Sequence, residues 1–325
     1  MAFRLKLVPD KTNFDFFRWQ RFTFGGSMLL MVVAIAAWMV VGLNFGIDFK
    51  GGTSVRTESS TPVDVGAYRQ ALSGFGLGDV SITQVFDPSF GPDKNVAMVR
   101  IGSQDGYEAV TAETLSAVEQ ALVAMDPALK VAGVESVGPK VSGELVWTSL
   151  MALAATSAGV LVYIWLRFEW QFALGGVLAL LHDVLITIGI FAVFQIKFDL
   201  TIVAALLTIL GYSINDTVVV FDRLRENLIK YKSMPLIEVM NLSVNETLSR
   251  TLMTSGTTLL ALTAMLIWGG DVIRGFSFAI FIGVILGTYS SVYVAKNIVL
   301  IIGLDRSEKP KGGKGTPTEY AGIDA

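Results

Sequence analysis

The sequence contains no cysteine and a single histidine, His182, among its 325 residues. The first absence excludes disulfide bonds, thiolate catalysis and cysteine-ligated metal or iron–sulfur sites. The second excludes a multi-histidine metal site, so we expect neither a metal nor another cofactor. Charged residues are also scarce, at 16%, and the net charge is only −3. Because there is no basic, aromatic-rich face, a nucleic-acid partner is not expected.

Apolar residues, in contrast, make up 52% of the chain, and the mean hydropathy is +0.58. Crossing the hydrocarbon core of a bilayer takes about 20 helical residues. Runs of suitable length predict six transmembrane helices, at 22–43, 145–166, 172–194, 200–221, 251–268 and 275–302. The first run is too long for a signal-peptide core and no cleavage site follows it, so we interpret it as a retained anchor.

Lysine and arginine are distributed unevenly between the segments that join these runs. They are frequent in residues 1–21, in the polar link 222–250 and in the tail 303–325, whereas the short turns on the other side carry only Lys197 and Arg274. The positive-inside rule therefore predicts cytoplasmic termini and a cytoplasmic link. Aromatic residues among the N-terminal charges favour contact with membrane lipid at the surface. The tail, rich in Gly, Lys, Pro and Thr, is expected to be disordered.

The first two runs are separated by a soluble insert, residues 44–142, which we expect on the side of the membrane opposite the cytoplasm. Its pattern predicts strands at 54–58, 80–86, 96–102 and 131–137 and helices at 62–74 and 107–125. That order, βαββαβ, is typical of a ferredoxin-like α+β domain. Thr61 is the expected N-cap of the first helix, with Pro62 at its first position. The insert has no cluster of catalytic side chains, which favours a binding or mechanical module.

The stretch NFGIDFKGGT follows the first run and contains Gly46, Asp48, Gly51 and Gly52. A phosphate-binding loop needs its glycines to open a helix after a strand. Here β-formers follow instead, so nucleotide binding is rejected. We expect a structural motif, a tight turn that carries the chain from the first helix into a strand.

The fourth run is interrupted by polar residues around Asp216. A carboxylate within a membrane helix costs about 2.5–3.5 kcal/mol on insertion scales, and such a residue is by default a functional candidate. Arg250 begins the fifth run at a similar depth and is its best expected partner, with Thr254 on the same helical face. Ser213 and Asn215 lie close enough in sequence to hydrate the acid or relay a proton. The pattern predicts a proton pathway, and a static polar contact between helices is the alternative.

Asp183, near the middle of the third run, is a candidate for the same proton pathway, although for His182 and Asp183 a static polar contact is the favoured interpretation. Adjacent side chains on a helix point about 100° apart, so His182 and Asp183 are not expected to form a dyad. His182 is interpreted as a packing residue. An intramembrane hydrolase built on these two residues also lacks a nucleophile motif such as G-x-S-x-G, so an enzyme is not expected. Gly283 and Gly287 have the small-xxx-small spacing that allows close helix approach.

Several of these stretches together resemble the SecD/SecF family of bacterial protein-export membrane subunits, within the resistance-nodulation-division superfamily. The matching stretches, in order, are GIDFKGGT, VESVGPKVSGEL, HDV, GYSINDTVVVFDRLREN and SRTLMTS. The resemblance implies half of a resistance-nodulation-division-type assembly, in the inner membrane with the insert on the periplasmic side, in complex with SecD. It further implies association with the SecYEG translocon, YajC and YidC, contact with the translocating preprotein, and use of the proton-motive force. By motif, Asp216 and Arg250 match positions that the family uses for proton conduction.

Two other functions remain open at this point. One is half of a small-molecule or lipid exporter of the same superfamily, although the single small insert leaves no room for large paired pore domains. The other is a structural scaffold, in which the intramembrane charges serve assembly alone.

Overall fold

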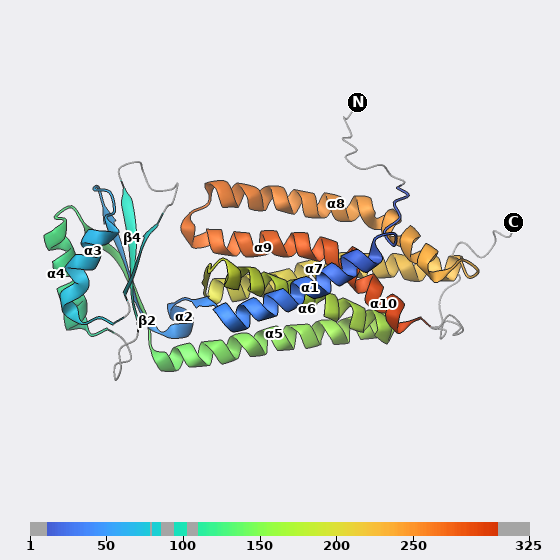
Figure 1. Cartoon of the computed structure of the whole chain (residues 1–325), viewed down its shortest axis with the longest axis horizontal. Coiled ribbons are helices and arrows are strands. Elements are labelled where there is room, and N and C mark those ends of the chain that lie inside the picture. The colour runs from blue at the N-terminus through green and yellow to red at the C-terminus, as the bar shows by residue number, and fades with distance from the viewer. Residues whose placement is uncertain (1–11, 79, 86–93, 103–109, 305–325) are drawn as a thin grey trace, which may run out of the picture.

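The computed structural model describes residues 12–78, 80–85, 94–102 and 110–304. The expectations for residues 1–11, for the end of the second insert strand, for the first residues of its second helix and for the tail beyond residue 304 lie outside this range. A long helical bundle carries a small α/β domain at one end, and the described chain begins at residue 12 and stops at residue 304 toward the opposite end (Figure 1). We refer to these as the domain end and the terminal end of the bundle.

The bundle consists of the six expected spans, and the chain is a multi-pass membrane protein. The spans are α1 (Gln20–Val41), α5 (Pro139–Arg167), α6 (Trp170–Val193), α7 (Leu200–Lys230), α8 (Leu236–Trp268) and a sixth formed by α9 (Asp271–Ser290), the π-helical turn η2 (Ser291–Ala295) and α10 (Lys296–Ile302). Each of the six is long and apolar enough to cross a membrane. The predicted number and order of spans are confirmed.

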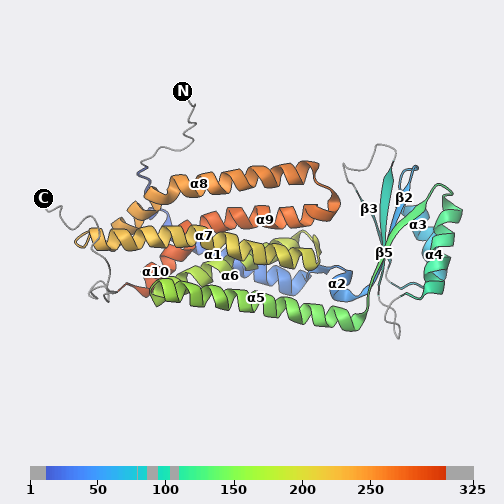
Figure 2. The same cartoon turned by 180° about the vertical axis from the view of Figure 1, so that it is seen from behind.

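The polar link expected at 222–250 is largely helical, because α7 and α8 both continue beyond the apolar runs. Only residues 231–235 separate them, and the two extensions project at the terminal end (Figure 2). Polar side chains join the extensions: Arg223 Nε donates to Glu246 Oε2 at 2.7 Å, and Asn227 Nδ2 donates to the same oxygen at 2.7 Å. The helices therefore form one continuous hairpin.

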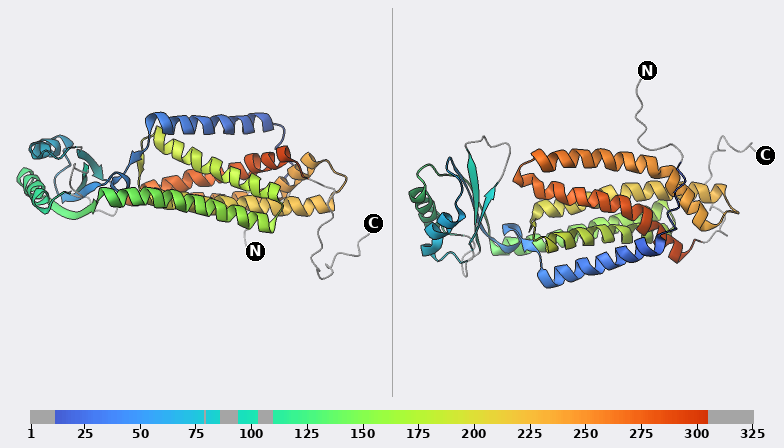
Figure 3. Two further views of the ribbon diagram at one scale, coloured as in Figure 1. Left: turned by 90° about the horizontal axis from the view of Figure 1, so that it is seen from below. Right: turned by 45° about the horizontal axis from the view of Figure 1, so that its top comes forward.

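α7 lies in the middle of the bundle and packs closely against α9. A Cβ atom on Gly283 would lie 2.3 Å from Ile209 Cγ1, and one on Gly287 would lie 2.9 Å from Ser213 Cβ. Both distances are shorter than real Cβ contacts, so the predicted close approach at these glycines is confirmed. α1 and α5 lie on the outside of the bundle (Figure 3) and expose many large apolar side chains, as lipid-facing helices do.

The α/β domain has the predicted βαββαβ order. Its elements are β2 (Gly52–Ser59), α3 (Val65–Leu72), a short 3₁₀ turn η1 (Ser73–Phe75), β3 (Val80–Val85), β4 (Asn95–Gly102), α4 (Ala112–Met125) and β5 (Lys130–Val137). The sheet order is β3-β4-β2-β5 with every pair antiparallel, which is the split βαβ arrangement. α3 and α4 cover the face that points away from the bundle (Figure 1), where Val55, Val99 and Val118 form the core.

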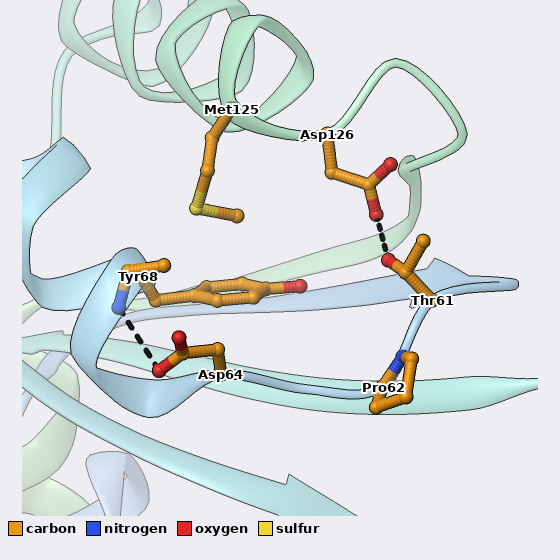
Figure 4. A pocket seen from close by; sticks show the side chains of 7 residues that line it. Thr61, Pro62, Asp64, Tyr68, Met125 and Asp126 are labelled. Carbon is orange, nitrogen blue, oxygen red and sulfur yellow. Dashed lines mark hydrogen bonds between the residues drawn. The ribbon is translucent and has the colours of Figure 1, made fainter.

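The start of α3 differs from the expectation. The helix begins at Val65, and its N-cap is Asp64, whose side chain accepts hydrogen bonds from the Gly66 and Ala67 amides. Thr61 instead donates to Asp126 across a shallow pocket of about 140 Å³ (Figure 4). Thr61 was predicted as the cap because it precedes a proline, but Asp64 is an equally good capping residue.

Residues 44–50 form a junction between the domain and the bundle, and they differ from the single tight turn expected. β1 (Asn44–Phe45) pairs in parallel with β6 (Lys197–Phe198), which lies between α6 and α7. A one-turn helix, α2 (Ile47–Lys50), follows and ends at Gly51, where the chain turns into β2. The sheet of the domain therefore begins at Gly52.

Candidate functional site

Asp216 lies in the middle of α7 and is 4% exposed. Its Oδ2 accepts a hydrogen bond from Ser255 Oγ of α8 at 3.4 Å, and Ser255 Oγ in turn lies 2.7 Å from Thr288 Oγ1 of α9. The carboxylate thus faces a small polar space between three helices and has one long hydrogen bond in the described structure. An ionised carboxylate with so few partners is costly to bury, whereas a neutral one is much less so.

Arg250 does not form an ion pair with Asp216 within the described part of the chain. Its side chain is exposed on α8, and its charge acts on the carboxylate only from a longer distance. Thr254 is exposed as well and donates to the backbone oxygen of Arg250 at 3.1 Å. Within this chain Ser255 of α8 meets Asp216, whereas Arg250 and Thr254 are exposed. A direct pair of Asp216 with Arg250 is thus not formed among the described residues, and the role of Arg250 and Thr254 in a proton pathway stays a prediction. Asn215 is also exposed on α7.

Asp183 of α6 forms a second buried polar site, which meets α7 at Ser213, three residues before Asp216. It is fully buried, and its Oδ2 accepts from Ser213 Oγ of α7 at 2.7 Å and from Ser290 Oγ of α9 at 2.8 Å. Its Oδ1 lies 2.9 Å from His182 Nδ1. Ser213, expected beside Asp216, is thus a partner of Asp183. Hydrogen bonds to both oxygens make this carboxylate a fixed link between α6, α7 and α9.

The contact between His182 and Asp183 corrects the expectation that they would not pair. Their Cβ atoms diverge, but the imidazole and carboxylate are long enough to curve back toward each other. His182 also stacks on Tyr289, with ring centroids 6.4 Å apart, and its Nε2 has no hydrogen-bond partner among the described residues. Both nearby serine hydroxyls donate to Asp183, so no described serine is held by His182 as a nucleophile would be by its base.

The glycine-rich junction binds the domain end of α7. Asp48 Oδ2 accepts a hydrogen bond from the Leu200 amide at 3.0 Å, and Asp199 accepts from the next two amides as the helix N-cap. Gly51 and Gly52 have φ angles of 75° and 124°, which side-chain-bearing residues rarely adopt. A Cβ atom on Gly52 would also lie 2.3 Å from the Ile101 carbonyl oxygen. The φ angles of Gly51 and Gly52, the close approach at Gly52 and the hydrogen bond of Asp48 explain why the motif contains these three residues.

Gly46 lies at the closest approach between β1 and β6. Its amide donates to the Phe198 carbonyl oxygen at 2.8 Å, and a Cβ atom there would lie 3.0 Å from Lys197 Cε. The junction is therefore joined through backbone and side chain to the segment that opens α7.

A cleft of about 950 Å³ separates the open face of the sheet from the domain end of the bundle. Arg56 and Arg100 line it from the sheet, and Asp48 and Asp199 line it from the junction. Burial lowers the pKa of the Arg100 guanidinium, while the charges of Asp199 and Asp48 act in the opposite direction. Arg100 therefore lies within the electrostatic field of the two acids that cap α7.

Three residues at the two carboxylates were not identified from the sequence: Ser255, Thr288 and Ser290. Ser255 follows Thr251 by one helical turn, and that spacing was the available signal for a polar face. Thr288 and Ser290 flank a tyrosine within a span whose glycines were noted only for packing.

Two family models match the chain. The model described as "Protein export membrane protein SecD/SecF, C-terminal" matches residues 117–305, and the model described as "SecD/SecF GG Motif" matches residues 36–63. The first covers α5 to α10 and with them both buried carboxylates. The second covers the junction with Gly46, Asp48, Gly51 and Gly52.

Similar proteins and a similar structure were also found. A protein translocase subunit SecF from Cereibacter sphaeroides is 66% identical over 325 residues, which is 100% of both chains. A subunit of the same name from Rhodobacter capsulatus is 68% identical and covers 96% of this chain and 95% of that one. The crystal structure of SecDF from Thermus thermophilus, titled a translocon-associated membrane protein, matches with a TM-score of 0.80 and 36% identity. The match covers 91% of this chain, which spans only 39% of that one.

Proposed function

Because this chain belongs to the SecD/SecF family of protein-export membrane proteins, we propose that it acts with SecD as a proton-motive-force-coupled auxiliary subunit of the Sec export machinery. The pair lies in the bacterial inner membrane, associates with the SecYEG translocon, YajC and YidC, and promotes the late stages of preprotein translocation. The termini and the α7–α8 extensions face the cytoplasm, in keeping with their lysines and arginines, and the α/β domain faces the periplasm.

The observation that carries the proposal is the setting of Asp216. The carboxylate is buried at mid-helix, faces hydroxyl groups of two other helices and has one long hydrogen bond. A change in its protonation therefore changes the balance of contacts between α7, α8 and α9. Moving one charge through 100 mV provides about 2.3 kcal/mol, so a few protons suffice for a substantial rearrangement.

The junction supplies the route from α7 to the α/β domain. Asp48 binds the first amide of α7, and two residues after α2 the chain enters β2 of the sheet. A shift of α7 along its axis moves Asp48, and the charges of Asp48 and Asp199 act on Arg100 of the neighbouring strand β4. We propose that the bond of Asp48 to α7 and the direct entry of the chain into β2 deliver the motion of α7 to the periplasmic domain.

SecD is proposed as the partner because α7 exposes a polar face at membrane depth. Thr208, Gly211 and Asn215 recur at helical spacing on its exposed side, and Arg250 and Thr254 are exposed on the neighbouring α8. Polar groups in contact with lipid are costly, and intramembrane charges nearly always face other protein or water. A second membrane chain over this face satisfies them and brings an acid within reach of Arg250.

Substitution of Asp216 tests the coupling. In inverted membrane vesicles that contain this chain, SecD and the translocon, Asp216→Asn is expected to abolish the stimulation of preprotein translocation by the proton-motive force. Asp222→Asn, one and a half turns further along α7 on a half-exposed residue, is the matched control and should retain it. Full stimulation with Asp216→Asn would exclude this mechanism.

Cross-linking tests the partner. The chain has no cysteine, so Asn215→Cys introduces its sole thiol. Paired with single cysteines along SecD, it is expected to form a disulfide with that subunit. Leu260→Cys, on a 73% exposed residue of α8, is the control for random contact in the membrane. If both cysteines cross-link equally, the polar face is not the SecD surface.

A further inference from the structure

The N-terminal segment (residues 12–17) lies across the terminal end of the bundle and is bound there by two asparagines of α8. Asn245 Oδ1 accepts from the Phe14 amide at 2.8 Å, and Asn245 Nδ2 donates to the Phe14 carbonyl oxygen at 2.9 Å. Asn241 Oδ1 accepts from the Phe16 amide at 2.9 Å. These bonds satisfy backbone groups before α1 begins and fix the segment to a different span.

Lys296, the first residue of α10, is the other attachment point of the segment. It is 1% exposed, and its ammonium group has no hydrogen-bond partner among the described residues. The nitrogen lies 4.0 Å from the centre of the Phe17 ring, 5.3 Å from that of Phe16 and 5.5 Å from that of Tyr293. A buried lysine within a span is costly, and here aromatic faces supply its attraction. Two of the three rings belong to the N-terminal segment.

Phe16 closes an apolar layer between Asp216 and the terminal end. Val220 of α7, Val244 of α8 and Val292 of η2 form a buried cluster, and Phe16 and Tyr293 pack against it. Val220 follows Asp216 by one turn, about 6 Å along the helix. Val292 likewise follows Thr288 by one turn, and Thr288 is hydrogen-bonded to the Ser255 hydroxyl that contacts Asp216. The layer also includes η2, and π-helical turns frequently mark functional sites.

We propose that the N-terminal segment is the cytoplasmic seal of the Asp216 site. Phe16 completes a hydrophobic layer that keeps water from the carboxylate, as apolar constrictions do in channels. Lys296 is a positioning residue, which holds the Phe16 ring on that layer and the Phe17 ring beside it. Release of the segment opens a path from the cytoplasm to Asp216. The inference rests on the proton-coupled role of Asp216 proposed above and adds the control of its inner side.

Accessibility of a thiol tests the seal directly. In a chain that has no other cysteine, Val220→Cys is expected to react slowly with a water-soluble maleimide added to the cytoplasmic face of inverted vesicles. Phe16→Ala should raise that rate several-fold, and so should Lys296→Met. Lys296→Arg, which keeps a cation over the rings, should restore slow labelling. Trp19→Ala is the matched control, because Trp19 is 59% exposed and its ring packs on Phe22 and not on Phe16. Equal labelling with and without the Phe16 side chain would overturn the inference.

Proton flux distinguishes this inference from the proposed function. In proteoliposomes that contain the chain with SecD, Phe16→Ala should increase proton leak several-fold in the absence of preprotein, and adding Asp216→Asn should remove the increase. A leak that persists with Asp216→Asn overturns the link to that site. If Phe16→Ala prevents assembly, Phe16→Leu serves in both assays, since it keeps an apolar side chain but loses the ring above Lys296. If proton-driven translocation depends on Asp216 but substitution of Phe16 changes neither labelling nor proton leak, the seal is rejected and the proposed function still holds.

Discussion

Asp183 and Asp216 are two buried carboxylates in one bundle, and their surroundings differ sharply. Asp183 accepts two serine hydroxyls at 2.7 and 2.8 Å and faces an imidazole nitrogen at 2.9 Å. Among the described residues, Asp216 accepts one hydrogen bond, from the Ser255 hydroxyl at 3.4 Å. The same residue type at membrane depth is therefore a firmly bound link in one case and a weakly held group in the other.

The two sites give α7 one firmly hydrogen-bonded position, at Ser213, and one weakly hydrogen-bonded position, at Asp216. Ser213 binds Asp183, and Asp216 lies three residues further along α7, facing α8. The Asp183 site holds α6, α7 and α9 in register. Against that fixed reference, the protonation change proposed for Asp216 is expected to act on α8 and on the ends of α7 instead of being absorbed by loose packing.

The comparison predicts opposite phenotypes on removing each acid. Asp183→Ala should destabilise the bundle by about 3–5 kcal/mol, since it leaves the imidazole and two hydroxyls without their buried partner. Asp216→Ala should change stability much less, because a single long hydrogen bond is lost. Thermal unfolding of the purified protein in detergent measures both. Equal losses of stability would remove the distinction between a structural and a responsive carboxylate.

Gly287 lies between the two sites, so enlarging it should disturb both. A Cβ atom would lie 2.9 Å from Ser213 Cβ, and overpacking of this kind costs about 1–3 kcal/mol. Gly287→Ala should lower thermal stability and, if Asp216 has the proton-coupled role proposed above, weaken export at the same time, as α9 moves away from α7. The control is Gly256→Ala in α8, where nothing lies within 4 Å of the added Cβ. A normal export rate in a destabilised Gly287→Ala chain would show that the two sites are independent.

A third acid, Asp48, binds α7 at its domain end and extends the comparison beyond the membrane centre. Asp48→Ala removes the acceptor of the Leu200 amide and should cost about 0.5–2 kcal/mol, as loss of a cap does. Asp48→Asn keeps an acceptor oxygen and should cost less. If the junction also transmits motion, Asp48→Ala lowers export more than its stability loss explains. That excess is measured as export rate at matched amounts of folded protein.

The six spans and the βαββαβ order could be predicted because each depends on local pattern: run length for the helices and alternation with turns for the domain. The helical extension of α7 and α8 could not be predicted as readily, since residues 222–250 are polar and carry no apolar run. The packing of α9 on α7 was predictable at Gly283 and Gly287, where residue size alone allows the approach.

The partners of the intramembrane acids were harder to predict, because a sequence gives depth along a helix but not its rotation. Arg250 and Ser255 are five residues apart, which corresponds to about 140° around the helix. Depth favoured Arg250, whereas the packing of α8 turns Ser255 toward Asp216. In the same way, the angle between adjacent residues argued against a contact of His182 with Asp183, although the length of the two side chains permits it.

Asp126, in the α/β domain, is the aqueous counterpart of Asp183: it too accepts two hydroxyls, from Ser59 and Thr61, but it is exposed to water. These hydrogen bonds, with one from the Ala128 amide, hold the pKa of Asp126 below its ordinary value. A carboxyl with a lower pKa in the folded state adds stability that is present above the unfolded pKa of about 3.9 and is lost as the pH falls through the folded value.

We therefore expect Asp126→Asn to weaken the domain slightly at neutral pH and to leave it unchanged in strongly acidic solution. Exchange of the buried β4 amides with deuterated solvent, compared between the two chains across this range, measures the difference. The effect should be the smallest of those considered, because water competes for the same oxygens that Ser59 and Thr61 bind. A difference that persists unchanged at low pH would mean that Asp126 acts through its shape rather than its charge.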